Sequence, residues 1–172
     1  MILSIALCLW LLACTACDLK WREVPPGLTL PPLFGALLWQ ALTGNFALAL
    51  FVLLLFILAD LPVRSRGFAN GLQAAIYFLG LATSPEPVQA GLSMFAMLVI
   101  WVIWKLDKLG GADAQVLLTL VLLLGPSILL PISAAGGIQG LIHLLAREKN
   151  MPFMVSILAG TCMLFVAQPP TF

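Results

Sequence analysis

Asp18 and Asp113 are the residues of this chain whose type and position could do chemistry. Each lies at the end of a long apolar stretch, in a sequence that is 62% hydrophobic and only 9% charged. An acidic side chain at the boundary of an apolar layer is costly to keep, which makes it a candidate functional group. Two carboxylates that come close together share one proton, because the second proton becomes much harder to remove. Such a pair can activate a water molecule, with one carboxylate as base and the other as acid.

The composition of the chain predicts a membrane protein made of helices. The sequence has 172 residues and a mean hydropathy of +1.12, whereas a soluble domain carries roughly a quarter charged residues. Long apolar runs recur along its whole length, so we expect one all-α, polytopic integral membrane domain over residues 1–172. Membrane lipids would then surround it. The net charge of +1, without a large basic cluster, argues against a nucleic-acid partner.

Polar residues, prolines and glycines divide the sequence into eight apolar segments. They cover residues 1–17, 28–43, 46–60, 69–83, 87–105, 114–130, 132–146 and 152–167. Several have about 15 residues, or roughly 23 Å as a helix, which is short of the ~30 Å hydrocarbon core of a bilayer. We therefore expect about eight transmembrane helices. The alternative is six, with the remaining segments re-entrant or interfacial.

The positive charges predict the topology of these segments. The eight Lys and Arg residues form four pairs, which follow the first, third, fifth and seventh segments: Lys20 and Arg22, Arg64 and Arg66, Lys105 and Lys108, and Arg147 and Lys149. With eight spans, all four pairs lie on one side, which the positive-inside rule identifies as cytoplasmic. Both termini are then expected outside. The same topology puts Asp18 and Asp113 on the cytoplasmic face of a cell (inner) membrane.

The residues that flank the two aspartates have physical roles of their own. Gly110 and Gly111 precede Asp113, and glycines allow backbone torsions and close approaches that other residues forbid. Pro25 and the proline after it are expected to stop the helix that carries Asp18 and to fix the exit of its loop. Two plainer interpretations are open. Asp18 could be an interfacial charge beside a helix end, and Asp113 could be a helix N-cap.

Other candidate groups are weaker. Asp107 lies six residues before Asp113 and is an alternative partner, but lysines on both sides of it are typical of a solvated loop. The four cysteines all fall in apolar runs. Cys14 and Cys17 form a lone CxxC without a second CxxC or a histidine to complete a zinc site, so no metal site is expected.

The stretches around the aspartates match a known pattern. Residues 18–29 read Asp-Leu-Lys-Trp-Arg-Glu-Val-Pro-Pro-Gly-Leu-Thr, and Gly110-Gly111-Ala112-Asp113 is followed by Ala and Gln115. They resemble the type IV prepilin and preflagellin peptidases, a family of GxGD-type membrane aspartic proteases. The family's first motif is Asp, a short basic stretch, Ile-Pro-Asn and Leu-Thr. Its second is Gly-x-Gly-Asp, usually with Lys two residues on. Ala112 is similar to the Gly-x-hydrophobic-Asp form of the archaeal branch, whereas Gln115 departs from the pattern.

A third stretch near the C-terminus extends the resemblance. The family has a basic loop followed by Ile-Pro-Phe-x-Pro and a later glycine. Here a basic loop is followed by Met-Pro152-Phe153-Met-Val155, with Gly160 further on, so the second proline is missing. The three stretches occur in the family's order and cover essentially the whole chain.

The resemblance implies a membrane-embedded aspartic endopeptidase with its active site facing the cytoplasm. It would remove a short, basic, cytoplasmic leader from type IV pilin-like or archaellin-like precursors, which would be its partners. Asp18 and Asp113 would be the catalytic residues, and either could be the base. No metal or organic cofactor is implied. The zinc-binding domain of the N-methylating members is not expected, and residues 46–83 would be a hairpin inserted into the family's usual six spans.

Two other functions remain open on the sequence alone. A small proton-coupled transporter could use the two aspartates as ion ligands, although the chain has no internal repeat and no acid in the middle of a span. A non-catalytic membrane assembly factor could keep the same fold, and the departures at Gln115 and Val155 leave room for it.

Overall fold

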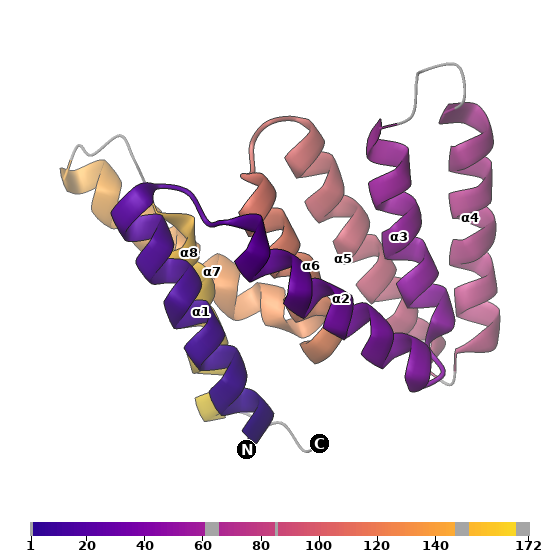
Figure 1. Ribbon diagram of the computed structural model, residues 1–172, viewed down its shortest axis with the longest axis horizontal. Coiled ribbons are helices and arrows are strands. Elements are labelled where there is room, and N and C mark those ends of the chain that lie inside the picture. Colours follow the sequence, from indigo (N-terminus) through magenta and orange to yellow (C-terminus); the bar gives the residue numbers. More distant parts are fainter. Residues whose placement is uncertain (1, 61–65, 85, 147–151, 168–172) are drawn as a thin grey trace. The chain divides into compact units, whose positions relative to one another are not determined.

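The protein is all-α throughout the part of the chain that its computed structural model describes, which is residues 2–60, 66–84, 86–146 and 152–167 (Figure 1). Eight α-helices and one short 3₁₀ turn occur in these ranges. They are α1 (Ile2–Trp21), α2 (Pro26–Leu42), α3 (Phe46–Asp60), α4 (Arg66–Thr83), α5 (Pro87–Lys105), α6 (Gly111–Leu124), the turn η2 (Pro126–Ile128), α7 (Leu129–Ala146) and α8 (Phe153–Ala167). The all-α prediction is thereby confirmed.

The helices follow the predicted segments closely except at the sixth. The sequence predicts that this segment runs to residue 130 with a turn at Pro131, but α6 ends at Leu124 and Pro131 lies inside the first turn of α7. The helix ends because Gly125 takes a left-handed conformation with φ of 79°, and its N–H closes the last turn on the carbonyl of Val121. Pro126 follows, and a proline shortly after a glycine cap is a common helix stop.

The chain forms two compact units, which are described separately. Unit 1 comprises residues Met1–Leu30 and Ser127–Phe172, and unit 2 comprises residues Pro31–Pro126. Unit 1 therefore contains α1, the first turn of α2, α7 and α8. In unit 2, α4 packs against α3 and α5, which also contact each other, and α6 packs against α5 (Figure 1).

The closest helix packing in unit 1 is between α7 and α8 at Gly160. A Cβ atom at this position would lie 2.5 Å from the backbone N and Cα of Ile132 and 2.8 Å from the carbonyl carbon of Pro131. The two backbones meet there because Gly160 has no side chain. Two of the glycines of α7 do not act in this way: at Gly136 a Cβ would make only ordinary contacts, and at Gly137 it would meet nothing within 4 Å.

The start of α2 is tied to α1 by an indole. Two prolines, Pro31 and Pro32, lie inside α2. Because proline has no N–H, Pro32 cannot donate to the carbonyl of Leu28, four residues before it. The indole Nε1 of Trp10 on α1 donates to that carbonyl at 2.8 Å. The hydrogen bond that the helix lacks is therefore supplied by its neighbour.

The lengths of the helices bear on the membrane prediction. Two of the described helices, Leu3–Trp21 and Pro87–Lys105, are long and apolar enough to cross a membrane on length and composition. Five further apolar stretches are shorter, among them Phe46–Ile57, Gly111–Leu124 and Phe153–Ala167. These lengths give modest support for membrane association.

Substitution of Gly160 tests the close packing of α7 and α8. We expect Gly160→Ala to lower the free energy of unfolding by about 1–3 kcal/mol or more, because a methyl group must force two backbones apart. Gly137→Ala is the matched control in the same unit, and it should be neutral or slightly stabilising because alanine favours a helix. Thermal unfolding of the purified protein in detergent measures both. Equal stability of the two variants would contradict the packing described here.

Candidate functional site

Asp18 lies in the last turn of α1 and is half-buried. Its backbone carbonyl accepts a hydrogen bond from the N–H of Arg22 at 2.9 Å. Arg22 has φ of 58°, in the left-handed region, and so ends the helix. Pro25 is the last residue before α2, and Pro26 is the first residue of that helix, where proline is favoured. The prediction that these prolines stop the helix that carries Asp18 is therefore wrong, because α1 ends at Trp21, four residues before Pro25; the prolines mark the start of α2 instead.

The face of α1 that carries Asp18 packs against the start of α8. Thr15 is one turn before Asp18 and on the same helix face. Its hydroxyl lies 2.8 Å from the carbonyl of Leu11 and 3.4 Å from the carbonyl of Met154, in the first turn of α8. Pro152 and the half-buried Phe153 stand at that helix start. Unit 1 thus brings the first and third stretches of the sequence pattern together, although they lie more than a hundred residues apart.

Gln139 on α7 holds the start of α8, a role that the sequence does not reveal. Its side-chain Nε2 donates to the carbonyl of Pro152 at 2.9 Å, and its Oε1 accepts from the hydroxyl of Ser156. One amide therefore engages both the residue before α8 and a buried serine in its first turns. An amide inside an otherwise apolar helix is the only sequence signal for this contact.

Asp113 is the third residue of α6 and is half-buried. The N-cap of α6 is Gly110, in an extended conformation with φ of −63° and ψ of 148°, so the interpretation of Asp113 as the N-cap residue is wrong. An acid in the first turn is still favourable, because the N-terminal end of a helix carries partial positive charge. Ala112, the small residue before Asp113, is also half-buried in this first turn.

The sequence predicts unusual torsions or close approaches at the two glycines before Asp113; neither has an unusual torsion, and only Gly110 makes a close approach. The backbone of Gly110 is extended, with ordinary torsions. Gly111 is the first residue of α6, and its φ is not positive. What distinguishes Gly110 is space, because a Cβ atom there would lie 3.0 Å from Oδ2 of Asp113. At Gly111 a Cβ would lie 3.6 Å from Nε1 of Trp104, an ordinary contact. The carboxylate of Asp113 therefore folds back over Gly110.

The two aspartates belong to different units, Asp18 to unit 1 and Asp113 to unit 2. Each has been described with its own surroundings, and their pairing stays a prediction. Asp107, the alternative partner, is exposed and has φ of 55° in the loop before α6. The side chains of Arg64, Arg66, Arg147 and Lys149 lie outside the described residues.

Two further observations concern possible metal binding and similarity to known proteins. Within the described residues, no three His, Cys, Asp or Glu side chains gather as a metal site would require. The four cysteines carry free thiols. Comparisons of the chain with protein-family models, with curated proteins and with solved structures found no match.

Substitution of each glycine tests the position of the Asp113 carboxylate. On the hypothesis that Asp113 acts in leader cleavage, we expect Gly110→Ala to reduce cleavage of a precursor with a basic leader by about tenfold, because the added methyl group would displace the Asp113 carboxylate. Gly111→Ala should retain activity, since its methyl group fits beside Trp104. Initial rates at equal amounts of folded protein measure the difference. If Gly111→Ala were the more damaged variant, the role assigned to Gly110 would be wrong.

Proposed function

We propose that this protein is a membrane-embedded aspartic endopeptidase that removes the short basic leader of pilin-like or archaellin-like precursors on the cytoplasmic face of the membrane. The proposal joins three parts. They are a polytopic position in the bilayer, a topology that puts both aspartates on one face, and a dyad formed by Asp18 and Asp113.

The distribution of large and small side chains on α5 supports the first part, a polytopic position in the bilayer. The exposed side of this helix carries large apolar side chains at Val88, Leu92, Phe95 and Val99, between 39% and 75% exposed. Its buried side is rich in small residues, Ala90, Gly91, Ser93 and Ala96, together with two methionines. Small residues at helix contacts and large apolar ones outside are the pattern of a helix in lipid. In a soluble protein, a surface helix turns its large apolar side chains toward the core and its polar side chains toward the solvent.

The order of the helices supports the second part, a topology with both aspartates on one face of the membrane. If each of the eight helices crosses the bilayer once, the connections after α1, α3, α5 and α7 fall on one side. All eight Lys and Arg residues of the sequence lie in or beside these four connections. The positive-inside rule then makes this side cytoplasmic. Asp18 at the end of α1 and Asp113 at the start of α6 border two of the same connections.

The observation that carries the proposal is the placement of both aspartates in the terminal turns of apolar helices. Each is half-buried beside one of the basic pairs. Around Asp18 the first and third stretches of the peptidase pattern pack together, and around Asp113 the second stretch leaves room for the carboxylate. Half-buried carboxylates at a membrane boundary suit a substrate whose leader is soluble and whose following segment is apolar.

The chemistry of the dyad needs no group outside the chain and water. One aspartate, ionised, takes a proton from a water molecule that attacks the carbonyl carbon of the scissile peptide. The other aspartate, protonated, gives its proton to the carbonyl oxygen as the tetrahedral intermediate forms. Protonation of the leaving amine then breaks the C–N bond. Because the two carboxylates are interchangeable in this scheme, either can be the base.

Neutral replacement of each aspartate tests the dyad. We expect Asp18→Asn and Asp113→Asn each to lower leader cleavage by at least about a hundredfold, because each removes one partner of general acid–base catalysis. Purified protein in detergent or liposomes is incubated with a precursor that bears a basic leader, and the shortened product is quantified. Asp107→Asn is the matched control, since it neutralises an exposed carboxylate in the neighbouring loop.

Four outcomes of the cleavage assay, together with a measurement of proton flux, distinguish the functions. Cleavage that needs both Asp18 and Asp113 but not Asp107 selects the peptidase. Full cleavage by either Asn variant rules out the dyad. No cleavage by the natural sequence, with proton flux in liposomes that depends on the aspartates, selects the transporter. No cleavage and no flux selects the assembly factor.

A further inference from the structure

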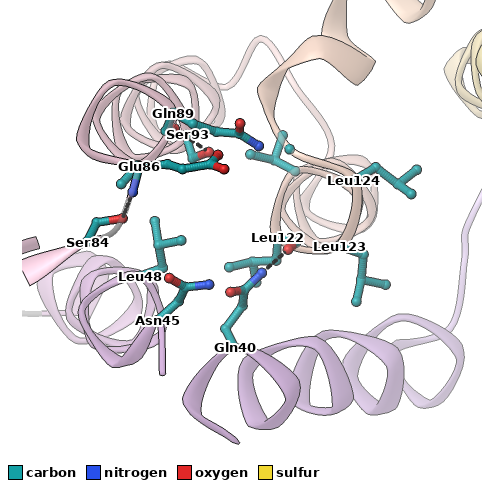
Figure 2. Close-up of a pocket in the computed structure, with 13 residues that line it drawn as sticks. Gln40, Asn45, Leu48, Ser84, Glu86, Gln89, Ser93, Leu122, Leu123 and Leu124 are labelled. Atoms are coloured by element: carbon teal, nitrogen blue, oxygen red, sulfur yellow. Dashed lines mark hydrogen bonds between the residues drawn. The ribbon is translucent and has the colours of Figure 1, made fainter. Parts of the chain in front are cut away.

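Unit 2 contains a polar cavity of about 370 Å³ that the peptidase function does not use (Figure 2). It lies where the end of α2, the start of α3, the start of α5 and the end of α6 meet. This is a typical size for a site that holds a small organic group. The cavity is at the C-terminal end of α6, whereas Asp113 is at the N-terminal end, about 15 Å away along the helix.

The cavity presents hydrogen-bond acceptors. Glu86 precedes α5 and makes no capping hydrogen bond with its side chain. Figure 2 shows its carboxylate extending toward the end of α6. The last residues of that helix, from Leu122 to Leu124, also line the cavity. A helix C-terminus carries partial negative charge on its last carbonyl groups.

Gln40 adds an acceptor whose orientation is set by the protein. Its Nε2 donates to the carbonyl of Leu122, which identifies the other amide atom as oxygen. This Oε1 is buried and has no hydrogen-bond partner. A buried acceptor without a donor is unfavourable, because it has lost its hydrogen bonds to water without replacement. A ligand that brings an N–H group into the cavity would remove this cost.

The charge of the lining favours a cation over an anion. None of the thirteen described residues that line the cavity is Lys, Arg or His, and Glu86 supplies a negative charge. A divalent metal suits the cavity poorly, because calcium takes six to eight oxygen ligands and prefers several carboxylates. A primary ammonium group has three N–H donors, and these match a carboxylate, a side-chain amide oxygen and a main-chain carbonyl.

We propose that this cavity binds a primary ammonium group carried on a small polar body, of the ethanolamine type. Such a group can come from a phosphatidylethanolamine headgroup or from a free amine in solution. Glu86 supplies the charge-assisted hydrogen bond, and Gln40 Oε1 supplies a neutral one. The proposal does not rest on the peptidase function, because no residue of the cavity belongs to the aspartate sites.

Titration with ethanolamine tests the ammonium site directly. The purified protein in detergent is titrated with ethanolamine and, in parallel, with choline, whose trimethylated nitrogen has no N–H to donate. We expect saturable binding of ethanolamine and at least about tenfold weaker binding of choline, because the hydrogen bonds to the cavity are lost. Calorimetry gives both dissociation constants.

Substitutions assign that binding to the cavity. Glu86→Gln keeps the size of the side chain and removes its charge, so it should weaken ethanolamine binding by about tenfold or more. Asp107→Asn removes an exposed carboxylate elsewhere in unit 2 and should leave the binding unchanged. If Glu86→Gln does not fold, Gln40→Met tests the same cavity by removing the buried acceptor.

The source of the ammonium group is decided in nanodiscs. Native mass spectrometry compares lipid retention from phosphatidylethanolamine and phosphatidylcholine discs, with and without Glu86→Gln. Preferential retention of phosphatidylethanolamine that is lost in the variant identifies the lipid. Ethanolamine binding without lipid preference identifies a free amine. The proposal is overturned if ethanolamine does not bind, if choline binds equally well, or if Glu86→Gln binds as tightly as the natural sequence.

Discussion

Buried polar groups in this chain are satisfied mainly by the helix that carries them, and the rest of the structure depends on this constraint. The hydroxyls of Thr15, Ser93, Thr119 and Thr161 each bond to the carbonyl four residues earlier, at 2.8–2.9 Å. This pairing lets polar side chains face neighbouring helices while large apolar side chains face outward. Contacts between helices then need few hydrogen bonds from one helix to another, and small residues can bring the backbones together. Within the described residues, the side chains of Gln139, Trp10 and Gln40 bond to other helices instead, and the Thr15 hydroxyl also lies 3.4 Å from the carbonyl of Met154.

Much of the helical architecture could be predicted from the sequence, because prolines, glycines and charges interrupt the apolar runs. The sixth segment shows the limit of this reasoning. Hydropathy continues through Gly125 and Pro126 to residue 130, but the backbone torsion of Gly125 ends the helix at Leu124. Apolar side chains can belong to a turn as well as to a helix, so hydropathy alone could not separate the end of α6 from the start of α7.

The surroundings of the aspartates were less accessible to sequence reasoning. The pattern pointed to Asp18, Asp113 and their flanking residues, and the structure packs the helix of Asp18 against the start of α8. It could not show that Gly110 is needed for space and not for torsion, since that depends on the side-chain conformation of Asp113. Nor could it show Gln139 at the start of α8. Contacts of this kind depend on which helices become neighbours, and the order of residues along the chain does not contain that information locally.

On the proposal that this chain spans a membrane, the bond between Trp10 and Leu28 has a consequence for how the chain enters the bilayer. Helices of a membrane protein leave the ribosome one after another, so α1 reaches the lipid before α2. The carbonyl of Leu28 has no donor from its own helix, and a carbonyl without a donor is costly in hydrocarbon. It becomes satisfied only when α1 is already alongside. The first two helices are therefore expected to partition into lipid as a hairpin, and the prolines of α2 make this order of assembly part of the fold.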